Sequence, residues 1–358
     1  MLTKRVAKYV VAIAVIGFFY TVGPSLDYYV HLALGQMRLL LDARPIPEIL
    51  AENQLDPRKK ARLSFVAAVR EFGQQTMGLS VDDQYTCFYD AGGRPVSWNL
   101  SASLPDRLEA HIWNFPIVGA VPYKGFFDLE RAQRERNQLE SNGYDVWLSP
   151  VSAYSTLGFF ADPVLSTMLN YSDDGLATLL LHELTHSTVY APSQTDFNES
   201  LATFVGKEGS LIFLTELFGD SSRQILEARQ RRLDAKAFHG FVRKLVTDLD
   251  SLYNSGMSRE QILIERVSVM DRAKADYLSV RETLLLSPGA YDGFLDWRVN
   301  NARFLSFKRY HDLDDFKALF SACEGDMRHF VRISQSCAQT QVPRSCLQDT
   351  TAKLKNGI

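Results

Sequence analysis

The chain has 358 residues, of which 46% are hydrophobic and 23% charged, and its formal net charge is -3. This composition is typical of a folded globular protein with one large domain or two modest ones. It argues against nucleic-acid binding, which needs a strongly basic surface, because the basic run Arg229–Arg232 has acidic residues around it.

The N-terminus predicts a membrane anchor. Three basic residues within the first eight precede the apolar stretch Tyr9–Gly23, which is the pattern of an export signal. No small-x-small cleavage site follows, so we expect an uncleaved transmembrane helix over residues 9–25. Residues 1–8 would then be cytoplasmic, in a single-pass protein of the bacterial inner membrane whose catalytic domain faces the periplasm. The alternative is a buried N-terminal helix of a soluble domain.

The region that follows mixes helices and strands. Apolar residues at helical spacing predict one helix from Tyr29 up to Pro45 and a second over Pro57–Phe72. The segment TCFYD, the turn AGGR and the segment PVSWNLSA predict a β-hairpin, and HIWNF and VPYKGFF predict further strands. A helix over Ala132–Asn142 and one or two strands in YDVWLSPVSAYST complete this region.

The second half of the chain reads as mostly helical. Ser172, Asp173 or Asp174 can cap its first helix. The predicted helices run from Ser172 to about Tyr190, from Asp196 or Asn198 to Phe218, over Ser221–Tyr253 and Arg259–Leu285 as a long hairpin, and within Ala290–Ser334. We therefore predict an α+β fold. A small, mainly antiparallel sheet in residues 26–170 would precede a helical half in 171–358, both within one domain of residues 26–358.

Residues 182–186 form the motif that predicts chemistry, His182-Glu183-Leu184-Thr185-His186. On a helix, His182 and His186 lie one turn apart on the same face, so both imidazoles can bind one metal ion. Glu183 lies about 100° further round the helix and can act as a general base without binding the metal. A catalytic zinc site needs one more protein ligand and an open position.

The best candidate for the third ligand is Glu199, at the start of the next predicted helix. The short connection Ala191–Phe197 lets that helix fold back on the first one. Asp196 is the nearest competitor but is expected to cap the helix, and Glu208 lies more than two turns further on. The prediction is one Zn²⁺ ion bound by His182, His186 and Glu199.

Two helical histidines can also be ordinary surface or core residues. The flanking residues Leu179–Leu181 mark this helix as buried, however, and paired polar residues are costly there without a partner. This favours a metal site.

The segment HELTHSTVY followed by FNESLATFVGKEG resembles the gluzincin metallopeptidases, which combine HExxH with a Glu on the following helix. The segments GQMRLLLDARPI, FPIVGAVPYKGFFD, VSAYSTLGFFADPVLSTMLN and VNNARF also resemble the putative aminopeptidase family of bacterial envelope proteins, from about Leu26 to His311. The resemblance implies a zincin-like fold and aminopeptidase activity.

The same resemblance implies roles for further residues, namely an oxyanion donor and a strand that binds the substrate backbone. The donor candidates are Tyr154, Tyr190 and Tyr310, and the substrate-binding candidates are Tyr123, Lys124, Ser155, Thr156 and Gly158. The alternatives are half-buried packing tyrosines, an ordinary core strand and a surface lysine. An acidic group for the substrate amine would be Asp128, Asp162 or Asp173.

The leading functional hypothesis is zinc-dependent hydrolysis of peptides by an aminopeptidase. A membrane-anchored zinc endopeptidase and a non-catalytic envelope scaffold with a structural metal are the alternatives. Of the four cysteines, Cys337 and Cys346 could close a short loop, and Cys87 could reach Cys323 only through tertiary contact, so the pairing stays open. The oligomeric state is open as well.

Overall fold

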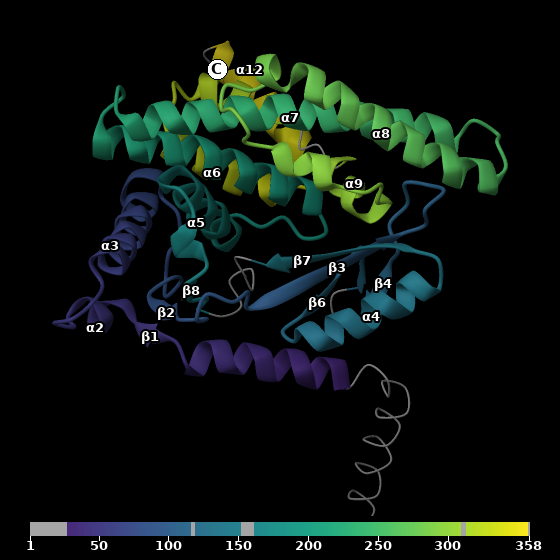
Figure 1. The fold of residues 1–358 in the computed structure, drawn as a ribbon. Helices are drawn as coiled ribbons and strands as arrows, with labels where there is room; N and C mark the ends of the chain where they lie inside the picture. The colour runs from purple at the N-terminus through teal and green to yellow at the C-terminus, as the bar shows by residue number, and fades with distance from the viewer. Residues whose placement is uncertain (1–26, 116–118, 152–160, 309–312, 357–358) are drawn as a thin grey trace, which may run out of the picture.

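The computed structural model describes residues 27–115, 119–151, 161–308 and 313–356. Two long antiparallel helices, α7 (Arg223–Tyr253) and α8 (Arg259–Leu284), form one layer of this α+β fold (Figure 1). Helices α5 (Asp173–Thr188) and α6 (Thr195–Phe218) lie beneath one end of that layer, and small sheets lie beyond them. The predicted order of a sheet region followed by a helical region is confirmed.

The N-terminal elements lie along one edge of the molecule. Residues 27–41 form a helix, followed by β1 (Arg44–Pro45), α2 (Ile46–Leu50), α3 (Pro57–Phe72) and the π-helical turn η1 (Gly73–Met77). Helix α3 has its predicted bounds because Asp56 accepts a hydrogen bond from the Lys59 N–H and Pro57 occupies the first turn.

The helix over residues 27–41 presents two different faces. Its inner face lies on the sheet region: Leu39 is buried, Gly35 lies directly against the Phe127 ring, and His31 accepts a hydrogen bond from the Phe127 N–H. Its outer face is apolar yet exposed. The exposed large residues recur at helical spacing, at Val30, Leu34, Met37 and Leu41.

The strands form three small sheets. The strands are β2 (Cys87–Tyr89), β3 (Ser97–Ser103), β4 (Trp113–Phe115), β5 (Gly119–Val121), β6 (Lys124–Phe126), β7 (Asp145–Val151) and β8 (Val164–Leu165). The sheet orders are β1-β2-β8, β6-β3-β7 and β4-β5, and all pairs are antiparallel except β2 with β8.

The predicted hairpin between TCFYD and PVSWNLSA is wrong. Both segments are strands, but β2 pairs with β1 and β8, whereas β3 pairs with β6 and β7. The turn between them does form, with Gly92 and Gly93 at positive φ. The chain after this turn enters a different sheet because segments from elsewhere in the sequence occupy both edges of β2.

Helices cover both faces of the β6-β3-β7 sheet. Helix α4 (Leu129–Ser141) packs on one face, where Leu100, Val146 and Leu139 share a core. Helix α9 (Asn301–Lys308) packs on the other face (Figure 1). Arg303 of α9 lies over the rings of Trp147 on β7 and of Trp297.

A buried polar cluster fastens the long helical hairpin to this sheet. Arg266 of α8 pairs with Asp145 at the start of β7 and donates to the Pro105 carbonyl. Asp145 also accepts the N–H of Asn301, whose side chain in turn accepts from Tyr253 of α7. The segment VNNARF therefore contributes to the joint between the two halves of the chain.

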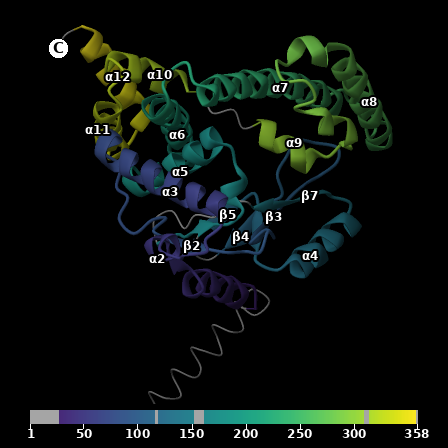
Figure 2. The same ribbon diagram turned by 60° about the vertical axis from the view of Figure 1, so that its left-hand side comes forward.

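The remaining helices lie in two places. Turn η3 (Asp292–Asp296) packs with α7 and α8, whereas η2 (Met168–Asn170), α10 (Asp314–Ala322), α11 (Met327–Ala338) and α12 (Pro343–Lys355) share the core of the helix that carries the motif. Figure 2 shows α10, α11 and α12 grouped beside α6, at the opposite end of the molecule from α8. They share the largest apolar core with α3, α5 and α6.

A disulfide joins Cys337 of α11 to Cys346 of α12, which is the short loop considered from the sequence. Cys87 and Cys323 are free thiols.

The prediction of a single-pass inner-membrane protein was wrong. Of the helices in the part of the chain that the structure describes, none has the length and apolar composition needed to cross a membrane. The longest ones, α7 and α8, carry charged residues in nearly every turn. The segment predicted as the anchor, residues 9–25, lies outside the described residues.

Candidate metal centre

Helix α5 presents the two motif histidines from a buried framework. Ser172 caps it by accepting the Gly175 N–H, and two aspartates in the first turn interact favourably with the positive end of the helix dipole. Its leucines fill the largest core, whereas His182 and His186 share the face toward α6. The helix ends at Thr188, close to the predicted end.

Helix α6 returns against α5 through a clamped connection. The Asn198 side chain accepts the Ala191 N–H and donates to the Ala191 carbonyl, both at 2.9 Å, so the start of α6 is tied to the connection that precedes it. Asp196 does not cap the helix as predicted. The N-cap residue is Gln194, and Asp196 in the first turn instead pairs with Arg344 at 3.2 Å.

Close packing of α6 on α5 brings Glu199 to the histidines. A β-carbon added at Gly206 would lie 2.6 Å from the Thr178 carbonyl oxygen, so this position admits only glycine at the present spacing. Further along, Ser210 of α6 donates to Asp174 of α5, which also accepts from Arg232 of α7. This network fixes three helices relative to one another.

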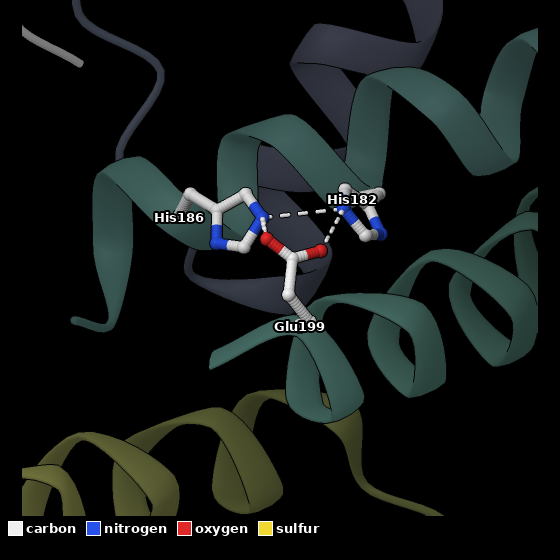
Figure 3. Close-up of side chains that lie close together, drawn as sticks. All are labelled: His182, His186 and Glu199. Atoms are coloured by element: carbon white, nitrogen blue, oxygen red, sulfur yellow. Dashed lines mark hydrogen bonds and ion pairs between the residues drawn. The ribbon is translucent and has the colours of Figure 1, made fainter. Parts of the chain in front are cut away.

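The three predicted ligands converge on one point (Figure 3). The Nε2 atoms of His182 and His186 lie 3.2 Å apart. The carboxylate of Glu199 spans the pair, with Oε2 at 3.5 Å from His182 Nε2 and Oε1 at 3.6 Å from His186 Nε2. Neighbouring donors around tetrahedral zinc, with bonds of about 2.1 Å, lie about 3.4 Å apart. With one donor atom from each residue, all three atoms lie within 4.8 Å of one another, so the group could hold a metal ion.

Burial differs among the three side chains and shows where the site opens. The His186 side chain is 3% exposed, whereas the side chains of His182 and Glu199 are 21% and 40% exposed. Solvent therefore reaches the site from the side of His182 and Glu199. Burial lowers the pKa of His186 to about 4, His182 acts in the same direction, and Glu199 opposes the shift. His186 is thus neutral at pH 7, which is the form that binds metals.

Glu183 follows His182 on α5 and is half-buried. Tyr85, which precedes β2, is buried and interacts electrostatically with Glu183. Burial raises the pKa of Tyr85 well above its ordinary value, and the charges of Glu183 and Asp162 add to the shift. The phenol therefore stays protonated across the physiological range. Tyr85 also has a φ of 56°, which is rare for an aromatic residue and marks a locally strained backbone.

A family model described as putative aminopeptidase matches residues 27–345. The chain belongs to the putative aminopeptidase family. No curated protein and no solved structure matched it in the corresponding comparisons. The matched range contains all three metal-ligand candidates and Glu183, and the expected resemblance to the putative aminopeptidase family is confirmed. The family description suggests a peptidase.

The structure does not test the further roles that the putative aminopeptidase resemblance implied. Tyr154, Ser155, Thr156, Gly158 and Tyr310 are outside the described residues, so their roles stay predictions. Tyr190 and Tyr123 are exposed. Lys124 pairs with Glu135 at 2.7 Å, and its ammonium group lies over the Tyr28 ring.

The acidic candidates for the substrate amine also have local partners. Asp128 caps α4 by accepting the Arg131 N–H, and Asp173 pairs with Arg62. Asp162 is buried, and its backbone carbonyl accepts the Tyr85 N–H.

Sequence reasoning missed several residues that surround the three candidate ligands in this member of the putative aminopeptidase family. Asn198 clamps the α5–α6 connection, Gly206 permits the close approach of the two helices, and Arg344 contacts α6 from the distant C-terminal region. The one available signal was the pair of small residues Gly206 and Gly209 on α6, which marks a helix face suited to close packing.

Proposed function

We propose that this protein is a zinc-dependent peptidase of the gluzincin type, acting as an aminopeptidase. The observation that carries the proposal is the convergence of His182, His186 and Glu199, with Glu183 next to the first histidine. The family description supports peptide-bond hydrolysis. In this proposal residues 26–358 form one metallopeptidase domain with a zincin-like arrangement.

His182, His186 and Glu199 would hold the ion. Two imidazoles and one carboxylate form a donor set that suits zinc, and three protein ligands leave a fourth position open. An ion bound there supplies Lewis-acid chemistry, which acidifies water and polarises a carbonyl group. The exposure of His182 and Glu199 supports access of a substrate from that side.

Glu183 would act as the general base. Its carboxylate takes a proton from the attacking water and later passes that proton to the leaving amine. Tyr154 and Tyr310 are the proposed donors that stabilise the developing oxyanion. Ser155, Thr156 and Gly158 are proposed to contact the substrate backbone, with Tyr123 and Lys124 at a second wall.

The proposal is tested with purified protein, zinc and a peptide mixture in which half of the peptides have acetylated N-termini. We expect cleavage of the free peptides only, one residue at a time from the N-terminus. Glu183→Gln should lower turnover by about 10²–10⁴-fold and leave the zinc content unchanged. Glu208→Gln is the matched control, because Glu208 lies on α6 more than two turns beyond Glu199.

The alternatives predict different results in the same assay. An endopeptidase would cleave acetylated peptides internally. If the protein is a scaffold with a structural metal, the wild type and Glu183→Gln would both bind zinc and neither would cleave a peptide. Equal turnover by Glu183→Gln and the wild type would contradict the proposed mechanism.

A further inference from the structure

Glu199 lies one turn into α6, close to a helix end that has no ordinary cap. The N-cap residue is Gln194, and its side chain makes no capping hydrogen bond. Uncapped first turns leave backbone N–H groups unsatisfied and tend to fray. The start of α6 is therefore held by contacts other than a cap, of which the bonds of Asn198 to Ala191 are one set.

One arginine contacts both polar residues that flank Glu199. The Nη2 atom of Arg344 lies 3.2 Å from Asp196 Oδ2 and 3.2 Å from Ser200 Oγ, three residues before and one residue after the ligand. Its Nη1 atom lies 3.4 Å from Asp315 Oδ2 of α10. Ser200 is fully buried, and the Arg344 side chain is 26% exposed.

Arg344 itself is fixed by the C-terminal helices. It is the second residue of α12 and lies inside the short loop closed by the Cys337–Cys346 disulfide. Cys337 is buried in the largest core, so the disulfide fastens the start of α12 to a packed helix. The guanidinium also lies over the Phe316 ring of α10.

These contacts form a continuous connection from the disulfide to the metal ligand. A guanidinium presents several donors in a fixed plane, so it can hold a carboxylate and a hydroxyl on one helical turn together. Groups that orient a metal ligand from outside typically change metal affinity when they are removed.

We propose that Arg344 is a positioning residue for the metal ligand Glu199, and that the Cys337–Cys346 disulfide keeps Arg344 in its place. The inference rests on the proposed metal site. If Arg344 had a purely structural role, its replacement would lower the free energy of unfolding. Zinc binding would then weaken no more than this loss of stability explains.

The test measures zinc affinity, with the full-length protein and a competing chromophoric chelator. Arg344→Met keeps the length of the side chain and removes the donors, so we expect zinc binding about 10–100-fold weaker, with an unchanged circular dichroism spectrum. The zinc affinity of Arg344→Lys should lie between those of Arg344→Met and the wild type, because one ammonium group cannot replace all the donors of the planar guanidinium group.

Arg62→Met is the matched control. Arg62 is likewise half-buried, bonds Asp173 and the carbonyls of Leu169 and Tyr171, and supports the start of α5 instead of α6. It should lower the urea midpoint of the zinc-free protein without weakening zinc binding. Equal loss of zinc affinity in both variants would overturn the proposal.

The disulfide is tested in a double-mutant cycle. Cys337→Ser with Cys346→Ser should weaken zinc binding in the wild-type background but have little further effect in the Arg344→Met background. Additive effects would overturn the role given to the disulfide. Should Arg344→Met not fold, Asp196→Ala removes one of the partners of Arg344 and should still weaken zinc binding several-fold.

Failure of this inference is distinguishable from failure of the proposed function. Tight zinc binding by Arg344→Met overturns the inference alone. Zinc binding that depends on Arg344, in a protein that cleaves no peptide, overturns the peptidase and leaves the positioning role. A wild-type protein that binds no zinc overturns both.

Discussion

A β-carbon added to Gly206 of α6 would lie 3.2 Å from the β-carbon of His182 on α5. The same atom would lie 2.6 Å from the Thr178 carbonyl oxygen. This oxygen belongs to the backbone of α5, so the clash could be relieved only by moving α5 and α6 apart. The spacing of the two helices, and with it the reach of Glu199, thus depends on the absence of a side chain at position 206.

Gly206→Ala should therefore move α6 away from α5. We expect a loss of about 1–3 kcal/mol in the free energy of unfolding from overpacking, and zinc binding at least about tenfold weaker. Chelator competition and urea titration measure the two effects. Gly240→Ala is the control, because a β-carbon at this position of α7 meets nothing within 4 Å. Gly240→Ala should leave the free energy of unfolding unchanged or raise it by at most about 1 kcal/mol. Unchanged zinc affinity in Gly206→Ala would show that the close approach is dispensable.

Metal removal should leave the fold in place. The buried leucines of α5 and the core that they share with α3, α6 and the C-terminal helices do not depend on an ion. Zinc added at a thousand times its dissociation constant should raise the free energy of unfolding by about 4 kcal/mol. Thermal melts at increasing zinc concentrations measure this shift. His182→Ala should abolish the response, and magnesium should give none because it prefers oxygen ligands. A collapse of the circular dichroism signal on chelation would contradict this expectation.

The buried pair between Arg266 and Asp145 should be a major contributor to the joint between the long hairpin and the sheet. The side chains are 4% and 18% exposed. Arg266→Met leaves a buried carboxylate without its guanidinium and should cost about 3–5 kcal/mol in urea denaturation. Arg223→Met is the control, since its pair with Glu227 is exposed on one helix and should change stability by less than about 0.5 kcal/mol. A loss below about 1 kcal/mol for Arg266→Met would argue that the aromatic contacts of α9 suffice.

Acidification should loosen the helix over residues 27–41. Burial lowers the pKa of His31 below its ordinary value of 6.5, with Arg131 acting in the same direction and Asp128 and Asp27 opposing it. The neutral ring accepts the Phe127 N–H. Because the folded pKa is the lower one, the unfolded state takes up a proton first as the pH falls. The stabilisation is therefore complete above about pH 6.5 and is lost below it.

Hydrogen exchange of residues 27–41 at pH 7.5 and 5.5, corrected for intrinsic rates, checks the effect, and an NMR titration should place the pKa of His31 below 6.5. In His31→Gln an amide oxygen can accept the same bond without titrating, so the pH dependence should disappear. If His31→Gln keeps the same pH dependence, another group is responsible.

Most helices and the group of three candidate ligands were predictable because their signals are local. Pro57–Phe72 carries its own cap and apolar spacing, and His182, His186 and Glu199 lie within two consecutive helices. Strand pairing was not predictable, because the partners of Cys87–Tyr89 come from segments more than forty residues before and seventy residues after it. The pairing of so short a strand depends on which other strands the packing of the helices places beside it.

The supporting contacts of the centre were equally inaccessible. Arg344 lies more than 140 residues from the turn that it holds, and an arginine before a cysteine near the C-terminus has no distinguishing pattern. Tyr85 has a positive φ that an aromatic residue does not lead one to expect, and the charge of Glu183 contributes to the raised pKa of its phenol. Asp196 was expected as a cap, yet a long-range ion pair took precedence over its local tendency.

The four residues of the motif centre, His182, Glu183, His186 and Glu199, lie within eighteen consecutive positions. Bringing together points so near along a chain costs little conformational entropy, whereas each strand pair of the N-terminal half must close a far longer loop. The approach of the three donors is therefore set first by one helical hairpin, which can form before the slow, non-local pairing of the sheets. The contacts of Arg344 with Asp196 and Ser200 are added only when the C-terminal helices pack against α6.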